Sequence, residues 1–103
     1  MIKYNKAIRD KIPQIIKSSG KNCNVKKLDN LEFLIQLEKK LVEELAEYQE
    51  SKNVEELADV LEVIYRISKL KGVVPDELDK IRQKKAEQRG KFEDNLFLVD
   101  SDK

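Results

Sequence analysis

The sequence predicts an all-α, single-domain protein whose core is an antiparallel hairpin of two long helices, with shorter helices on either side. The chain has 103 residues, which suits one domain (1–103) and is too short for two. It contains only three Gly and two Pro, so few residues interrupt helices. Its apolar residues recur at spacings of three and four, which is the period of one helix face.

The first element is a short helix of about two turns that begins at Ile12. Pro13 suits a first helical turn, because its ring fixes a helical φ and no N–H is left unsatisfied. Gly20 suits the position after the last turn. Residues 21–28 are expected to form a connector, extended around 25–28.

A long helix follows. Asp29, with Glu32 three residues later, has the spacing of a capping box and predicts a helix that runs to about Ser51. One face of this helix is apolar, through Leu34, Leu37, Leu41, Leu45 and Tyr48.

A second long helix is predicted from Asn53, which repeats the capping pattern with Glu56, to Leu70, where Gly72 stops it. The turn at 51–54 is so short that the two long helices must be antiparallel neighbours. The apolar positions of the second helix are Leu57, Val60, Leu61, Ile64 and Ile67.

A fourth helix is predicted from Pro75 to the residue before Gly90. Leu78 and Ile81 are its main apolar positions. Residues 92–99 are apolar and are expected to form a short extended C-terminal tail that packs on the bundle or on a partner.

Composition excludes several classes of function. With 21 basic and 20 acidic residues the net charge is +1, which gives no basic excess for nucleic-acid binding. The absence of His excludes His metal sites and a His general base. The single cysteine, Cys23, cannot form an internal disulfide, and no apolar run approaches membrane-spanning length. We therefore expect a soluble, cytoplasmic protein without a membrane partner. Its limited core makes oligomerisation plausible.

Four acidic residues carry the chemistry. Glu44 and Glu47 are three residues apart on the first long helix, and so are Glu56 and Asp59 on the second, so each pair shares a face. At about 1.5 Å of rise per residue, both pairs lie at nearly the same height in an antiparallel hairpin. The four carboxylates are therefore expected to converge.

Converging carboxylates repel one another, and a divalent cation resolves this. Hard cations prefer oxygen ligands, so Mg²⁺, with Mn²⁺ as an alternative, is the predicted metal. Such a site can polarise a phosphoryl oxygen and activate water, which indicates hydrolysis of a phosphoanhydride. The competing interpretation is an ordinary solvated acidic face. The residues alone leave these two evenly balanced.

Basic residues on both flanks are candidates for binding substrate phosphates. Lys85 and Arg89 share a face near the end of the fourth helix, and Lys6 and Arg9 precede the first helix. The alternatives are cations that complement the helix dipole at the fourth helix, and surface charges or an Arg9–Asp10 pair at the N-terminus.

The motif Glu43-Glu44-x-x-Glu47, followed by Glu56-x-x-Asp59, resembles the signature of the all-α nucleotide pyrophosphohydrolases, the MazG-like superfamily. The segments 4–13 and 85–92 resemble a small single-domain branch of it, predicted to clear non-canonical nucleotides. The resemblance covers residues 4 to about 98.

The resemblance implies Mg²⁺-dependent hydrolysis of a nucleoside triphosphate to the monophosphate and pyrophosphate, by a homodimer or homotetramer. Glu44, Glu47, Glu56 and Asp59 match the family's metal-ligand positions. Glu43 also matches the motif and would assist a second ion or orient water. The catalytic candidates are thus Glu43, Glu44 and Glu47, and a general base would have to be one of these carboxylates. The alternative function is a non-catalytic helical module that binds a nucleotide or another protein.

Overall fold

The chain is all-helical over the residues that the structure describes. The computed structural model describes residues 2–102, and within that range it has four α-helices and no strand. The helices are α1 (Ile12–Ser18), α2 (Asn30–Ser51), α3 (Val54–Leu70) and α4 (Pro75–Arg89). Each begins and ends within a residue or two of its predicted position, which confirms the all-α prediction. The connector at 21–28, expected to be partly extended, contains no strand.

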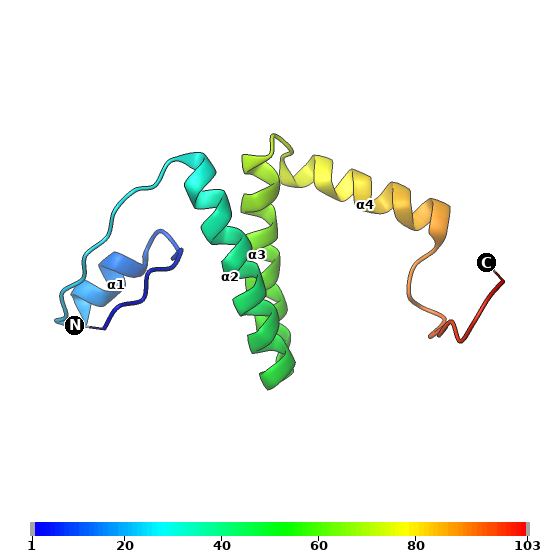
Figure 1. The fold of residues 1–103 in the computed structure, drawn as a ribbon, viewed down its shortest axis with the longest axis horizontal. Helices are drawn as coiled ribbons and strands as arrows, with labels where there is room; N and C mark the ends of the chain where they lie inside the picture. Colours follow the sequence, from blue (N-terminus) through cyan, green and yellow to red (C-terminus); the bar gives the residue numbers. More distant parts are fainter. Residues whose placement is uncertain (1, 103) are drawn as a thin grey trace.

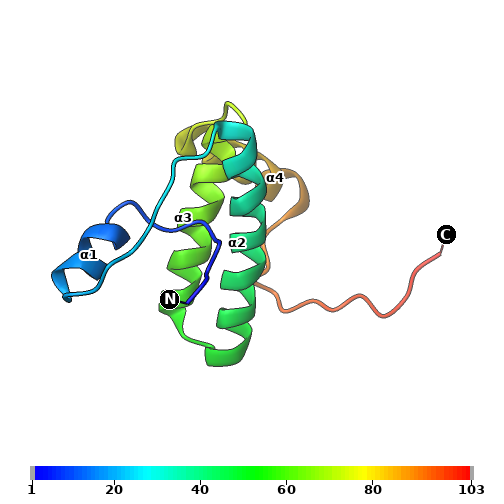
Figure 2. The same cartoon turned by 60° about the vertical axis from the view of Figure 1, so that its left-hand side comes forward.

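The centre of the structure is the hairpin in which α2 and α3 pack side by side and run in opposite directions (Figure 1). The turn between them is tight, and Lys52 adopts a left-handed conformation with φ of 62°. The Lys52 N–H donates to the carbonyl of Tyr48 at 2.7 Å and so closes the last turn of α2. α1 and α4 lie on opposite sides of this hairpin, as the two views show (Figures 1 and 2).

The two long helices begin differently. The carboxylate of Asp29 accepts a hydrogen bond from the Glu32 N–H at 2.8 Å, which confirms the predicted cap of α2. The corresponding cap of α3 was predicted wrongly, because the Asn53 side chain makes no capping bond. The Glu56 N–H, which that side chain would have capped, donates to the Asn53 backbone carbonyl at 3.1 Å. Within the same short turn the Asn53 N–H donates to the hydroxyl of Ser51 at 3.2 Å. The turn, and not a capping side chain, fixes where α3 starts.

The core is small. Ala7, Leu37 and Val63 form a buried cluster, and no large side chain in residues 2–102 is fully buried. Ala7 comes from the segment before α1, so the burial of its methyl group holds this part of the segment against the hairpin. The partly buried residues that pack around this cluster are Phe33, Leu41, Ile67 and Leu70.

The junction of α3 and α4 is held by the buried Ser68, whose hydroxyl donates to the Val73 carbonyl at 2.7 Å. Beyond it, α4 touches only α3 and projects away from the hairpin (Figure 1). The tail follows α4 outward, and Phe92 and Phe97 are 102% and 88% exposed. The prediction that residues 92–99 pack on the bundle is therefore wrong within this chain, because α4 carries them away. None of the described helices is both long and apolar enough to cross a membrane.

The different starts of the two helices give a first prediction. Replacing Asp29 with Ala removes the side-chain cap of α2 and should lower the free energy of unfolding by about 1 kcal/mol. The Asn53→Ala variant is the matched control and should stay within a few tenths, because that side chain caps nothing. Urea denaturation followed by circular dichroism measures both. Equal losses in the two variants would contradict the capping assignment.

Candidate metal centre

The hairpin brings acidic residues of its two helices close together, in two groups of three rather than in the single group of four that the sequence predicted. Single oxygen atoms of Glu44, Glu56 and Asp59 lie within 4.8 Å of one another, and so do oxygens of Glu43, Glu44 and Glu47. Glu44 belongs to both groups and joins the acidic residues of α2 to those of α3. We call these five residues the carboxylate cluster. It exists because the short turn places the two acidic pairs at the same height on antiparallel helices.

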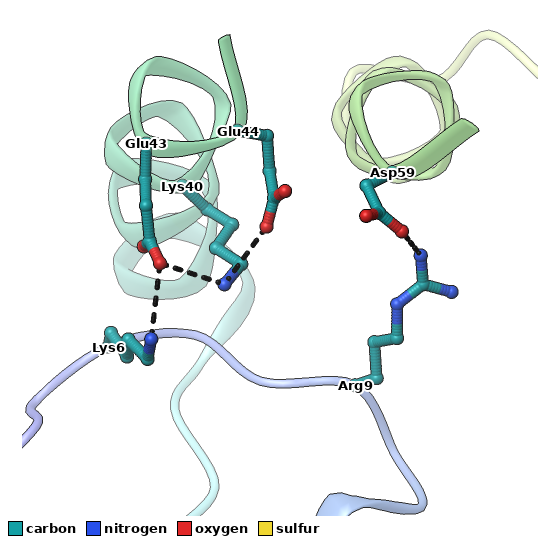
Figure 3. Close-up of polar contacts among 6 residues, drawn as sticks. All are labelled: Lys6, Arg9, Lys40, Glu43, Glu44 and Asp59. Carbon is teal, nitrogen blue, oxygen red and sulfur yellow. Dashed lines mark hydrogen bonds and ion pairs between the residues drawn. The ribbon is translucent and has the colours of Figure 1, made fainter. Parts of the chain in front are cut away.

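Glu44 is the centre of the cluster. It is only 7% exposed, between the two packed helices. One oxygen, Oε1, lies 3.2 Å from the Nζ of Lys40 (Figure 3). The other, Oε2, is buried and has no hydrogen-bond partner among the described residues. A buried acceptor without a partner costs about 1–3 kcal/mol, and more when it is charged. This oxygen is thus suited to a positively charged ligand.

The surroundings of the cluster oppose full ionisation. Burial raises the pKa of Glu44, and the neighbouring Glu47 carboxylate raises it further, against the opposing effect of Lys40. Burial also raises the pKa of the half-buried Glu56, with the Asp59 and Glu44 carboxylates adding to the effect. The fold therefore holds together carboxyl groups that would lose their protons more easily if they were apart.

The segment before α1 lies across the cluster and carries two cations to it. The Nζ of Lys6 is 3.1 Å from Glu43, and the guanidinium of Arg9 donates to Asp59 at 2.7 Å (Figure 3). The buried Ala7 between them holds both in place. The structure thus brings Lys6 and Arg9 to the cluster, and Arg9 pairs with Asp59 rather than with its neighbour in sequence, Asp10.

Lys40 is a site residue that the sequence reasoning missed. Its Nζ lies 3.4 Å from Glu43 and 3.2 Å from Glu44, on the same face of α2. The sequence spacing could have predicted this contact. Lys40 precedes Glu43 by three residues and Glu44 by four, and residues at these separations are neighbours on a helix. Burial alone would raise the pKa of Glu43, but Lys6 and Lys40 outweigh it and lower that pKa. Burial lowers the pKa of Lys40, yet bonding to Glu44 and Glu43 leaves it raised.

These cations do not neutralise the cluster. When all five carboxylates are ionised, they exceed the three basic side chains by two negative charges, which one divalent cation would balance. The Arg9–Asp59 pair is also weak, because its side chains are 57% and 40% exposed and such pairs contribute about 0–1 kcal/mol. A cation at Asp59 would therefore displace Arg9 at little cost.

Lys85 and Arg89 are not brought to the cluster within one chain. Both are exposed on α4, which lies on the opposite side of the hairpin from residues 2–11 (Figure 1). α4 is held only near its start, so its last turns have no contact that would direct them to the carboxylates.

The residues present fit a hard divalent cation. All the ligand atoms are carboxylate oxygens, as Mg²⁺ and Mn²⁺ prefer, and one of them is buried without a partner. The chain matches no protein-family model, no curated protein and no solved structure.

The raised pKa values give a prediction about stability. A carboxyl whose pKa is higher in the folded chain stabilises the fold at low pH and loses that contribution as the pH rises through the raised value. Without metal, the Glu44→Gln variant should therefore gain stability relative to the parent chain as the pH rises above about 4, the ordinary range of a glutamate carboxyl. Thermal unfolding in the presence of a chelator measures this difference.

The same experiment tests the cation. Millimolar Mg²⁺ or Mn²⁺ should raise the melting temperature of the parent chain at neutral pH and leave Glu44→Gln nearly unchanged. Glu62→Gln removes an exposed acid from the same hairpin and should respond like the parent. A similar response in all three chains would mean that the ions bind elsewhere.

Proposed function

We propose that this protein is a nucleoside triphosphate pyrophosphohydrolase that depends on a divalent cation and releases the monophosphate and pyrophosphate. The observation that carries the proposal is the buried, unpartnered Oε2 of Glu44 within carboxylates from two helices. The resemblance of the paired acidic motif to the MazG-like superfamily supports it, because the residues that carry the motif are those that meet in space. The substrate class, a non-canonical nucleotide, rests on that resemblance.

Glu44, Glu47, Glu56 and Asp59 would hold Mg²⁺, which when bound supplies positive charge to a phosphoryl oxygen and lowers the pKa of water. The protein's own contribution is to hold these side chains together. Burial between α2 and α3 keeps Glu44 in a single position, and the exposed Glu47 leaves the cluster open on its outer edge. A triphosphate can therefore approach the cluster without a rearrangement of the hairpin.

Glu43 has a different role from the ligands. Lys6 and Lys40 keep it ionised by lowering its pKa, so it remains a hydrogen-bond acceptor at neutral pH. A water molecule beside it would donate a proton to this acceptor and be oriented for attack on a phosphorus atom. Glu47 is the other carboxylate placed to accept that proton.

Lys6 and Arg9 would bind the phosphates. In the structure they pair with Glu43 and Asp59, through contacts that are weak because they are exposed. Once a cation satisfies Asp59, the guanidinium of Arg9 is free to make paired hydrogen bonds to a phosphate. Arg9 would thus exchange its carboxylate partner, Asp59, for a phosphate of the substrate.

The second candidate is a non-catalytic helical module that binds a nucleotide or another protein. The observation in its favour is the large number of apolar side chains that the hairpin leaves exposed. It differs from the enzyme in one measurable way, since it would bind a cation or a nucleotide without turnover.

Hydrolysis is tested by pyrophosphate release from a panel of standard and modified nucleoside triphosphates, with and without Mg²⁺. We expect turnover that requires the metal and falls by at least about 100-fold in Glu44→Gln and in Asp59→Asn. Glu62→Gln should keep full activity, and circular dichroism should show all variants folded. Cation binding without pyrophosphate release from any nucleotide would favour the non-catalytic module.

The role of Arg9 is tested by steady-state kinetics. Arg9→Ala should raise KM by on the order of 10-fold, because a charge-assisted hydrogen bond to phosphate is lost. The matched control is Arg66→Ala, which removes an exposed arginine of α3 and should change neither KM nor kcat. If KM is unaffected by Arg9→Ala, Arg9 only neutralises Asp59.

A further inference from the structure

An aromatic ring lies beside the carboxylate cluster and has no part in the proposed chemistry. It belongs to Tyr4, which is 68% exposed. Tyr4 is in the segment before α1, which crosses the hairpin (Figure 2). Single exposed aromatic side chains are ordinary on protein surfaces. Tyr4 differs from them because the residues that follow it are held against the cluster.

The contacts that hold this part of the segment begin two residues after Tyr4. Lys6 pairs with Glu43, and the next residue, Ala7, is buried against the hairpin. Asn5 has a left-handed φ of 46°, a conformation that Asn adopts more readily than most residues. The chain therefore bends between Tyr4 and Lys6. The Tyr4 ring lies beside the Lys6 ammonium, within the range of a cation–π contact.

Lys6 shows how close the ring is to the site. Its Nζ is 3.1 Å from Oε1 of Glu43 and 5.8 Å from the centroid of the Tyr4 ring (Figure 3 shows the contact with Glu43). The distance from the ring to that carboxylate oxygen cannot exceed the sum of these two. In a nucleoside triphosphate, a single sugar separates the α-phosphate from the base. A triphosphate bound at the cluster through Lys6 therefore has its base within reach of Tyr4.

The other aromatic rings are less well placed. One packs in the core, and two lie in the tail beyond α4 (Figure 1). A fourth follows Asp59 by six residues and is rotated by about 120° from it around α3. These are Phe33, Phe92, Phe97 and Tyr65. Tyr48 follows Glu44 by four residues, but its ring lies beside Lys52 at the end of α2. Within residues 2–102 no ion pair links that lysine to the cluster.

We propose that Tyr4 binds the base of the nucleotide, which stacks on its phenol ring while Lys6 and Arg9 bind the phosphates. The inference rests on the proposed function, because it takes the cluster to hold the triphosphate. Lys6 serves both parts of the ligand. When its ammonium turns from Glu43 to a phosphate, it leaves the face of the Tyr4 ring to the base.

A base held by stacking implies a broad class of substrates. Every base has a π-face, so stacking tolerates a change of base. A purine covers more of a phenol ring than a pyrimidine does and is bound more tightly. Recognition of the edge of a base requires polar groups fixed around it, whereas Tyr4 is exposed to solvent. The site therefore accepts standard and modified bases alike and prefers purines.

Isothermal titration calorimetry of the full chain with Mn²⁺ tests this inference with two probes. One is a dATP analogue with an imido group between the α- and β-phosphorus atoms, and the other is inorganic tripolyphosphate, which has no base. Tyr4→Leu should weaken binding of the analogue roughly 10-fold and leave the affinity for tripolyphosphate unchanged, because only stacking is lost. Tyr4→Phe keeps the ring and should bind both probes as the parent chain does. The corresponding dCTP analogue should bind less tightly than the dATP analogue.

The matched control is Phe97→Leu, which removes an exposed ring from the tail and should change neither affinity. Equal weakening of both probes by Tyr4→Leu would overturn the inference, since the side chain would then only support the segment. So would a loss confined to the dATP analogue in Tyr48→Leu instead, or a parent chain that binds neither probe. Hydrolysis is judged separately. A chain that binds the analogue through Tyr4 but releases no pyrophosphate from any nucleotide would refute the enzyme and support the base-binding role.

Discussion

The packing of α2 against α3 is the constraint on which the rest of the structure depends. It places the carboxylate of Glu44 in an interface that otherwise contains Leu37, Val60 and Val63. Burying a carboxylate there opposes stability unless something positive satisfies it, and Lys40 reaches only one of its two oxygens. Glu44 is a charged residue in an otherwise apolar interface, and further acidic residues surround it. Such an exception to the usual composition of a core is typical of a functional site.

The two sides of the hairpin differ in the kind of side chain that they carry. One side carries the cluster and is covered by the segment that Ala7 anchors, with Lys6 and Arg9 on either side of it. The other side is apolar and exposed. Because no large side chain of residues 2–102 is fully buried, the core alone provides little stability. On our account, a bound cation supplies part of the remainder.

The sequence predicted those features that depend on local spacing. The cap at Asp29, the stops at Gly72 and Gly90 and the matching heights of Glu44 and Glu56 all follow from the geometry of single helices and a short turn. The features that it missed depend on contacts between elements. The cap expected from the Asn53 side chain is absent, because within the two-residue turn the Glu56 N–H donates to the Asn53 backbone carbonyl instead.

Contacts across the chain were harder still to predict. Arg9 pairs with Asp59, fifty residues away, because a buried alanine fixes the segment between Lys6 and Arg9 on the hairpin. A periodic pattern in the sequence does not predict such a contact. The tail was expected on the bundle because it is apolar, but the direction of α4 decides where it goes, and that direction depends on the junction at Ser68.

The central claim is that carboxylates of two adjoining helices hold one divalent cation. The most direct measurement is a crystal structure of the protein grown with Mn²⁺, with anomalous scattering recorded at the manganese edge. Our account predicts a peak bonded to oxygens of Glu44, Glu56 and Asp59, with Arg9 turned away from Asp59. Carboxylates that point apart, with no anomalous peak between α2 and α3, would contradict it.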